Sequence, residues 1–241
     1  MSSEACDCWT EDVWRYIHSA AQISPMTALR EKESFLCMIG SINRIISCPV
    51  VEQIVDRFMK EIPFSQHSSS NNSVFFWTVC LRKAIHQLLG KPVLELAELN
   101  EMYSPKKLGK DVWGPFTWKV MHVVTLCAKP VSVAGRAAEL TSSARQTIKA
   151  FLTSVVLLLP CAKCKKHAWE YCSTHSIDDY LTNNLHAFQW TVEFHNMVNR
   201  RLNETEGYTK PIFTPMQALT HFVNIPSDNK YTPSFKPMRV E

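Results

Sequence analysis

The chain carries the same ordered set of anchors twice, and this repeat constrains its fold more than any other feature. Residues 8–18, CWTEDVWRYIH, align with residues 112–122, VWGPFTWKVMH, and residues 75–89, FFWTVCLRKAIHQLL, align with residues 188–202, FQWTVEFHNMVNRRL. Between these anchors, Cys48 and Cys161 each lie 29 residues before a tryptophan. Ordered anchors with one shared spacing indicate a tandem duplication, so we expect two copies of one folding unit.

The repeat sets the expected domain boundaries. We predict a flexible N-terminal segment with a Cys-x-Cys pair over 1–8, a first unit over 9–105, a second unit over 106–225 and a tail over 226–241. A chain of 241 residues is long enough for two such units, because domains typically run from about 50 to 200 residues.

Both units are expected to be helical. Glycine is scarce, with 6 in the chain, where average usage would give about 17. In the second unit the pattern predicts a helix over 114–128 with Pro115 near its start, a helix over 137–159 ended by Pro160, a helix that begins at or just after a Cys-x-x-Cys, a break followed by a long helix within 176–203, and a short segment around 214–223. We therefore predict an all-α fold of two tandem bundles, each with four helices plus a short fifth.

Composition excludes several classes of protein. The chain is 46% hydrophobic and 20% charged, which is ordinary for a soluble globular protein and argues against wholesale disorder. The net charge of +4 is spread along the chain, so nucleic-acid binding is poorly supported. The densest basic patches are Lys163, Lys165 and Lys166, and Arg200 with Arg201, which fit either a solvated surface or an anion site for cofactor phosphates.

The N-terminus, MSSEACDCWTED, has neither the charged nor the apolar region of a signal peptide. The longest apolar stretch, 150–160, is about half of the roughly 20 residues that span a bilayer. We therefore expect a cytoplasmic protein without a membrane span. Its 9 cysteines are many for that compartment, where thiol clusters more often serve metal binding or redox chemistry than structural disulfides.

The stretch LPCAKCKKHAWEYC, residues 159–172, allows three interpretations: a zinc site, a static disulfide or a redox pair. Structural zinc usually takes two spaced pairs of ligands, and the chain has no second Cys-x-x-Cys. The redox interpretation is favoured, because a helix N-terminus and neighbouring lysines stabilise a thiolate at Cys161 and Cys164, and the thiolate is the form that exchanges with disulfides.

A second constellation lies on the long helix near the C-terminus. His195, Asn196 and Asn199 form a polar group on an otherwise apolar helix, and such groups need partners when they are buried. A planar, polar cofactor would supply those partners, and Arg200 and Arg201 could meet its phosphates. Taken singly, Trp118, His122 and Trp190 are best interpreted as core residues.

The motifs WGPFTWKVMH, LPCAKC, WTVEFHNMVNRRL and KPIFT, in that order, resemble the Erv/ALR flavin-dependent sulfhydryl oxidases. The resemblance covers about 113–222, close to a full catalytic domain of that family. The WGPxxW opening is similar to members encoded by large DNA viruses, and a degenerate copy before an active one resembles the quiescin-type and baculoviral oxidases. A viral protein of this kind would reside in the host cytoplasm or the virion.

The resemblance implies an enzyme that oxidises dithiols of substrate proteins and passes the electrons through Cys161 and Cys164 to FAD and then to O2, giving H2O2. It makes Cys164 the flavin-proximal sulfur and Cys161 the outward one, and it implies no metal. The residues that it places around the cofactor are Gly114, Trp118, His122, Cys164, Trp190, His195, Asn196, Asn199 and Arg201.

The first unit departs from the family pattern. It has Val51, Arg82, Lys83 and His86 at the positions of Cys164, His195, Asn196 and Asn199. We interpret it as a pseudo-domain without cofactor that keeps the bundle and pairs with the second unit as two subunits pair in family homodimers. The expected assembly is a homodimer or this intrachain pseudo-dimer.

Some cysteines stay open at this stage. Cys172 matches the first cysteine of a second family disulfide, but the partner position holds Val192, so Cys172 is free or pairs elsewhere. Cys6 and Cys8 are either a shuttle that carries electrons from substrate thiols or terminal thiols without a role. The alternative function is a non-enzymatic helical scaffold or zinc-stabilised interaction module with a structural Cys-x-x-Cys.

Overall fold

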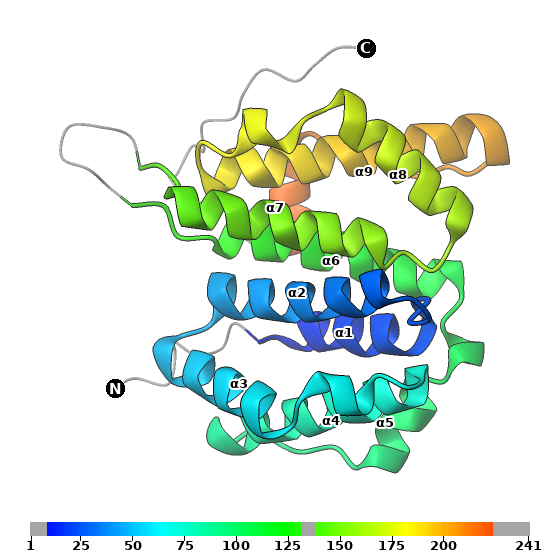
Figure 1. Ribbon diagram of the computed structural model, residues 1–241. Helices are drawn as coiled ribbons and strands as arrows, with labels where there is room; N and C mark the ends of the chain where they lie inside the picture. Colours follow the sequence, from blue (N-terminus) through cyan, green and yellow to red (C-terminus); the bar gives the residue numbers. More distant parts are fainter. Residues whose placement is uncertain (1–8, 132–137, 224–241) are drawn as a thin grey trace.

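The computed structural model describes residues 9–131 and 138–223 (Figure 1). Cys6, Cys8 and the tail over 226–241 lie outside the described residues. The described part is helical, with one isolated antiparallel bridge between Val131 and Glu139 and no strand. The predicted all-α fold is therefore confirmed. None of the described helices is long and apolar enough to cross a membrane.

Each half contributes five α-helices. Those of the first half are α1 (Glu11–Ile23), α2 (Leu29–Ile46), α3 (Pro49–Glu61), α4 (Asn71–Leu88) and α5 (Leu96–Met102). Those of the second are α6 (Lys110–Cys127), α7 (Ser142–Leu157), α8 (Ala162–Thr174), α9 (Asn184–Glu206) and α10 (Pro215–Val223). Short 3₁₀-helices cover Phe64–His67, Pro105–Lys107 and Ile177–Tyr180.

The helices form layers. α1 and α2 of the first half lie against α6 and α7 of the second, with α3 to α5 on the outer side of one pair and α8 to α10 on the outer side of the other (Figure 1). Buried side chains from both halves join in one apolar cluster, from Trp9 to Phe194. A smaller cluster of Phe188, Val192, Ala218 and Leu219 attaches α10 to α9. The two halves therefore share a core.

The repeated tryptophans have the same hydrogen bond in each half. The indole of Trp77 donates to the carbonyl oxygen of Ile62 at 2.8 Å, and the indole of Trp190 donates to that of His175 at 2.9 Å. Both indoles are buried, so the bond satisfies a donor that would otherwise be lost to the core. Each bond ties the long helix, α4 or α9, to the turn after the preceding helix.

The repeated histidines are also held alike. His18 Nδ1 lies 3.0 Å from Thr78 Oγ1, and His122 Nδ1 lies 2.7 Å from Thr191 Oγ1. All four side chains are buried. The repeat in the sequence thus has a counterpart in the hydrogen bonds that join the first and fourth helices of each half.

Two helix starts differ from the sequence prediction. α6 begins at Lys110, so Pro115 lies inside the helix and not near its start. α7 begins at Ser142 and not at 137, because the Thr141 side chain accepts a hydrogen bond from Ala144 N and caps the helix there. The bridge that pairs Glu139 with Val131 holds the residues before the cap in an extended conformation.

A shared core predicts that both halves unfold together. Phe35 of α2 and Phe151 of α7 are fully buried, and truncating either to alanine is expected to cost about 3–5 kcal/mol. We expect Phe35→Ala and Phe151→Ala each to shift one and the same urea transition, followed by tryptophan fluorescence and by circular dichroism. Two separate transitions, with only one displaced by each substitution, would contradict the shared core.

Candidate functional site

A cavity of about 290 Å³ opens in the second half. α6, α7, α8 and α9 form its walls, and its rim is closed by α10 and by the segment between α9 and α10. Its wall is mainly apolar and aromatic, from Trp113, Trp118, Phe194, Phe213 and Phe222. A largely apolar cavity with a few polar groups is the usual form of a site for a small molecule or cofactor.

Six of the residues expected around a cofactor line this cavity. They are Gly114, Trp118, Cys164, His195, Asn199 and Arg201. They come from α6, α8 and α9, which are separate segments of the sequence, and the bundle brings them together around one cavity.

The other three lie behind the wall. Trp190 is buried in the core, with its indole committed to a backbone carbonyl. Both polar groups of the Asn196 side-chain amide bond the backbone of Phe213. The nitrogen donates to its carbonyl oxygen at 2.7 Å, and the oxygen accepts from its N–H at 2.9 Å. His122 is fully buried and lies behind two residues that line the cavity, His195 and Phe222.

Asparagines of α9 hold the rim of the cavity in place. Asn199 donates to Pro211 O at 2.8 Å, and Asn203 donates to Lys210 O at 2.9 Å and accepts from Lys210 N at 2.6 Å. With Asn196 they form a polar stripe at helical spacing along the segment that follows α9. From the sequence we expected Asn196 and Asn199 at the edge of a cofactor. In the structure the side-chain amide of each bonds a backbone group of the segment after α9.

Several residues that line the cavity were not among those expected from the sequence. They are chiefly Lys110, His167, Tyr208, Lys210, Phe213 and Phe222. A signal was present in the KPIFT motif at 210–214, which places a lysine and an aromatic residue where the asparagine stripe of α9 binds the chain.

A stacked pair of rings forms one wall. His195 lies parallel to Trp118, with ring centroids 4.3 Å apart and planes 9° apart. His122 Nε2 lies 3.3 Å from His195 Nδ1. The ring stack and the histidine pair fix the orientation of His195, which lines the cavity.

The hydrogen-bond network assigns the protons of these histidines. Thr191 Oγ1 donates to Phe188 O at 2.6 Å, so it accepts from His122 Nδ1. His122 Nε2 is then an acceptor, and His195 donates to it from Nδ1. His195 Nε2 is left as an acceptor for a donor group of a ligand.

Burial keeps both rings neutral. It lowers the pKa of His122 well below its ordinary value, with the His195 ring adding to the effect. Burial also lowers the pKa of His195 to about 3, helped by the positive charges of His221 and Lys210. The proton assignment above therefore holds at neutral pH.

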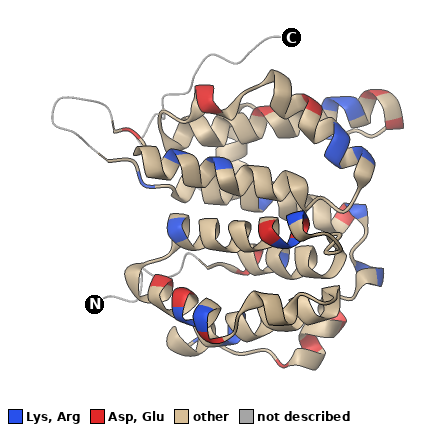
Figure 2. Ribbon diagram, in the orientation of Figure 1, with Lys and Arg blue, Asp and Glu red and all other residues tan. Residues whose placement is uncertain are grey.

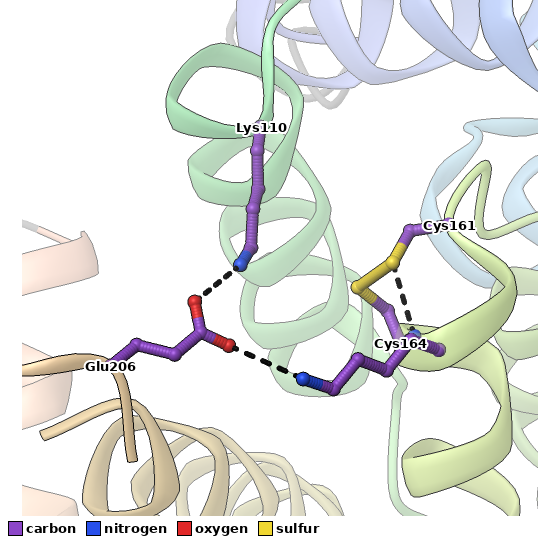
Figure 3. Close-up of a disulfide and its surroundings, with 5 residues drawn as sticks. Lys110, Cys161, Cys164 and Glu206 are labelled. Carbon is purple, nitrogen blue, oxygen red and sulfur yellow. Dashed lines mark hydrogen bonds and ion pairs between the residues drawn. A yellow bond between two sulfur atoms is a disulfide. The ribbon is translucent and has the colours of Figure 1, made fainter. Parts of the chain in front are cut away.

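Cys161 and Cys164 form a disulfide at the start of α8 (Figure 3). Cys161 is the N-cap residue, and its sulfur accepts a hydrogen bond from Cys164 N at 3.1 Å. Cys164 lines the cavity, and Cys161 is half-buried beside it. The positive end of the α8 dipole thus lies at a redox-capable pair, one sulfur of which belongs to the cavity wall.

A carboxylate links this pair to the rim. Glu206 at the end of α9 lies 3.2 Å from Lys110 Nζ and 3.9 Å from Nζ of Lys163, the residue before Cys164 (Figure 3). The hydrogen bond from Lys110 lowers the pKa of Glu206. Lysines and arginines mark the start of α8 and the adjoining part of α9 (Figure 2), so the predicted basic patches come together near the mouth of the cavity.

The cavity suits a planar ring system with a polar, anionic extension such as FAD. Two buried nitrogens in its wall, His167 Nδ1 and Arg201 Nε, have no hydrogen-bond partner in the described part of the chain. Buried polar atoms that line a cavity call for partners from a ligand. The Trp118 wall offers a ring face, and Arg201 with Lys210 offers positive charge for phosphates.

The other cysteines of the described residues do not extend this site. Cys172 makes no disulfide there and is half-buried, and burial raises the pKa of its thiol to about 11. Of the alternatives left open by the sequence, Cys172 is thus a free thiol. Within 9–131 and 138–223, no group of three or more His, Cys, Asp or Glu side chains could hold a metal ion.

Comparison with known proteins gives one consistent result. The family model described as the Erv1 / Alr family matches residues 115–217, the region that holds the cavity. The FAD-linked sulfhydryl oxidase of African swine fever virus (isolate Warthog/Namibia/Wart80/1980) is 34% identical over 93 residues, which is 38% of this chain and 69% of that protein. The chain belongs to the Erv1/Alr family.

Another relative in this family is the "Putative FAD-linked sulfhydryl oxidase 096R" of Invertebrate iridescent virus 3, which is 32% identical over 102 residues. That match spans 42% of this chain and 64% of the relative, just under two thirds of its length. No solved structure matches the chain.

The first half differs from an Erv1/Alr site at the position of His195. Arg82 stands there, is nearly fully buried, and pairs with Glu11 at 2.8 Å. Its guanidinium lies over the Trp14 ring at 5.9 Å, where His195 covers Trp118 in the second half. The space beside the repeated tryptophan is thus taken by a paired charge.

The low pKa of His195 predicts a dependence of stability on pH. The unfolded chain binds a proton at this residue near pH 6.5, and the folded chain only near pH 3, so the free energy of unfolding falls as the pH drops below 6.5. Between pH 7.5 and pH 5.0 this one site accounts for about 2 kcal/mol. In urea titrations of flavin-free protein, His195→Asn should lose about that much of the pH dependence; an unchanged dependence would contradict a neutral, buried His195.

Proposed function

We propose that the chain is an FAD-dependent sulfhydryl oxidase that forms disulfide bonds in substrate proteins. The observation that carries the proposal is the Cys161–Cys164 disulfide at the wall of an aromatic and histidine-lined cavity. Membership of the Erv1/Alr family supports it, as do the names of the viral relatives. The scaffold alternative gives no account of a redox-capable sulfur in a cavity wall.

The chain's cysteines would accept electrons in two exchange steps. A thiolate of the substrate attacks Cys161 Sγ, forms a mixed disulfide and releases Cys164 as a thiolate. The second substrate thiol displaces Cys161, so the substrate leaves oxidised, and two electrons with two protons remain on the pair. The positive end of α8 and the lysines near the cysteines stabilise the thiolates. FAD, when bound, would supply the acceptor for these electrons, with O2 as the final acceptor that is reduced to H2O2.

The chain's own residues would bind and orient that cofactor. The stacked Trp118 and His195 would offer a ring face to the cofactor's ring system, and the acceptor nitrogen of His195 would accept from a ring or ribose donor. Arg201 and Lys210 at the rim would meet the phosphates. Gly114 and Asn199 also line the cavity, whereas Asn196, Trp190 and His122 would act indirectly by holding the wall and rim.

The proposed division of labour assigns 9–105 to a pseudo-domain and 106–225 to the catalytic domain. The packing of α1 and α2 on α6 and α7 supports an intrachain pseudo-dimer in place of a homodimer. The absence of a membrane-spanning helix among the described residues is compatible with a cytoplasmic location, which stays part of the proposal. For Cys6 and Cys8, which lie outside the described residues, both alternatives stay open: a shuttle between substrate and Cys161, or terminal thiols without a role.

The redox role of Cys164 can be tested directly. Cys164→Ser should leave FAD bound, with its visible absorption band, and abolish oxygen consumption with dithiothreitol, because the pair can no longer accept two electrons. Cys37→Ser, at an exposed thiol of α2, is the matched control and should keep the full rate. Undiminished turnover in Cys164→Ser would overturn the assignment, and a colourless wild-type protein would favour the scaffold alternative.

Because Arg82, paired with Glu11, lies over Trp14 in the first half, we expect one FAD per chain, bound in the second half. His195→Arg copies the first half into the second, and the buried guanidinium should then prevent FAD binding, measured as the ratio of flavin to protein absorbance. Glu204→Ala, at an exposed position of the same helix that does not line the cavity, should keep the wild-type ratio. A ratio of two FAD per wild-type chain would contradict a pseudo-domain without cofactor.

A further inference from the structure

The segment that leads into the redox pair is held from the other half of the molecule. Leu158 is the C-cap residue that follows α7, and its carbonyl lies at the helix end, where helix carbonyls lack an intrahelical partner. Ser24 Oγ donates to this carbonyl at 2.6 Å. Both residues are only 2% exposed, so water does not substitute for the bond. Cys161 follows three residues later.

Ser24 is itself fixed at the end of α1. The side-chain amide of Asn71 donates to Ser24 O at 2.8 Å and to Ala21 O at 2.9 Å. Ser24 N donates to Ala20 O at 3.0 Å and closes the helix. The hydroxyl therefore projects from a rigid support formed by α1 and the start of α4.

Further contacts join the same two places. Tyr16, Ile23 and Ser24 of the first half line a small cavity together with Leu159 and Pro160. α2 lies along α7, the helix that delivers Leu158 (Figure 1). The segment 158–160, which precedes Cys161, thus lies against residues of the first half.

The hydroxyl has no counterpart in the repeat. Ser24 ends α1, and the residue that ends α6 is Ala128, which has no donor. The supporting amide is kept, since Asn184 of α9 donates to Leu126 O at 2.8 Å as Asn71 does in the first half. The amide is present in both halves, as expected of a group that only supports the end of the first helix. The hydroxyl is present only in the first half, where it binds the segment before Cys161.

We propose that Ser24 is a positioning residue for the redox disulfide: through Leu158 it fixes the segment 158–160 and so holds Cys161 and Cys164 against the cofactor cavity. This inference rests on the proposed oxidase function. It gives the first half, which has Val51 at the position of Cys164, a part in the reaction.

The test compares Ser24→Ala, Ser24→Thr and a control in the full-length, flavin-loaded protein. The control is Ser34→Ala, which removes another buried hydroxyl of the first half, one that bonds only Arg30 O of its own helix at 2.7 Å. Hydrogen–deuterium exchange of the amides over 159–165 reports how firmly the segment that leads into Cys161 and Cys164 is held. Steady-state rates with dithiothreitol, resolved into kcat and KM, report its consequence.

Ser24→Ala should speed exchange over 159–165 roughly threefold to tenfold, as loss of one hydrogen bond implies, and lower kcat with little change in KM. Ser24→Thr should restore both values, and Ser34→Ala should leave them at the wild-type level. Wild-type exchange in Ser24→Ala, or faster exchange with unchanged kcat, would overturn the inference. A wild-type protein without oxidase activity would instead overturn the proposed function, which the exchange measurement does not depend on.

Discussion

Burial of α2 against α7 is the constraint on which the rest of the structure depends. α2 buries Phe35, Met38, Ile39 and Ile42, and α7 buries Ile148, Phe151, Leu152 and Val155. Each such side chain contributes about 1.5–3 kcal/mol when removed from water. Neither half could expose this surface in isolation without a large apolar patch. Because the surface is shared, the position of α7, and with it the start of α8 and the redox pair, is set by the first half.

The two halves show how one helical framework can carry different chemistry. Both keep the tryptophan and histidine–threonine hydrogen bonds that hold the long helix, α4 or α9, in the bundle. The difference lies in the residue that covers the first-helix tryptophan. In the second half it is a neutral His195 beside an open cavity, and in the first half it is Arg82 paired with Glu11. The helical framework is therefore retained although the residue beside the repeated tryptophan differs between the halves.

Much of the site could be predicted from the sequence, because its motifs are local. Cys161 and Cys164 are three residues apart, and Trp118 and His195 belong to the short motifs WGPFTWKVMH and WTVEFHNMVNRRL that carry the family resemblance. The roles of Asn196 and Trp190 were not accessible in this way. Asn196 bonds the backbone of Phe213, and Trp190 bonds a carbonyl 15 residues earlier, and neither partner is indicated by residue type. The start of α7 also escaped prediction, because a bridge to Val131 competes with helix before Thr141.

The sequence by itself determined the helical class, the repeat, the family and the Cys-x-x-Cys pair that is proposed to be redox-active, since each depends on residue type and spacing along one stretch of chain. Only the tertiary structure decided which of the candidate residues reach the cavity, that Lys110, Tyr208 and Phe222 join them, and that Ser24 binds Leu158. These are contacts between segments far apart in the chain. Which polar groups meet there depends on how the apolar faces of ten helices are buried in the described fold, and no local pattern encodes that arrangement.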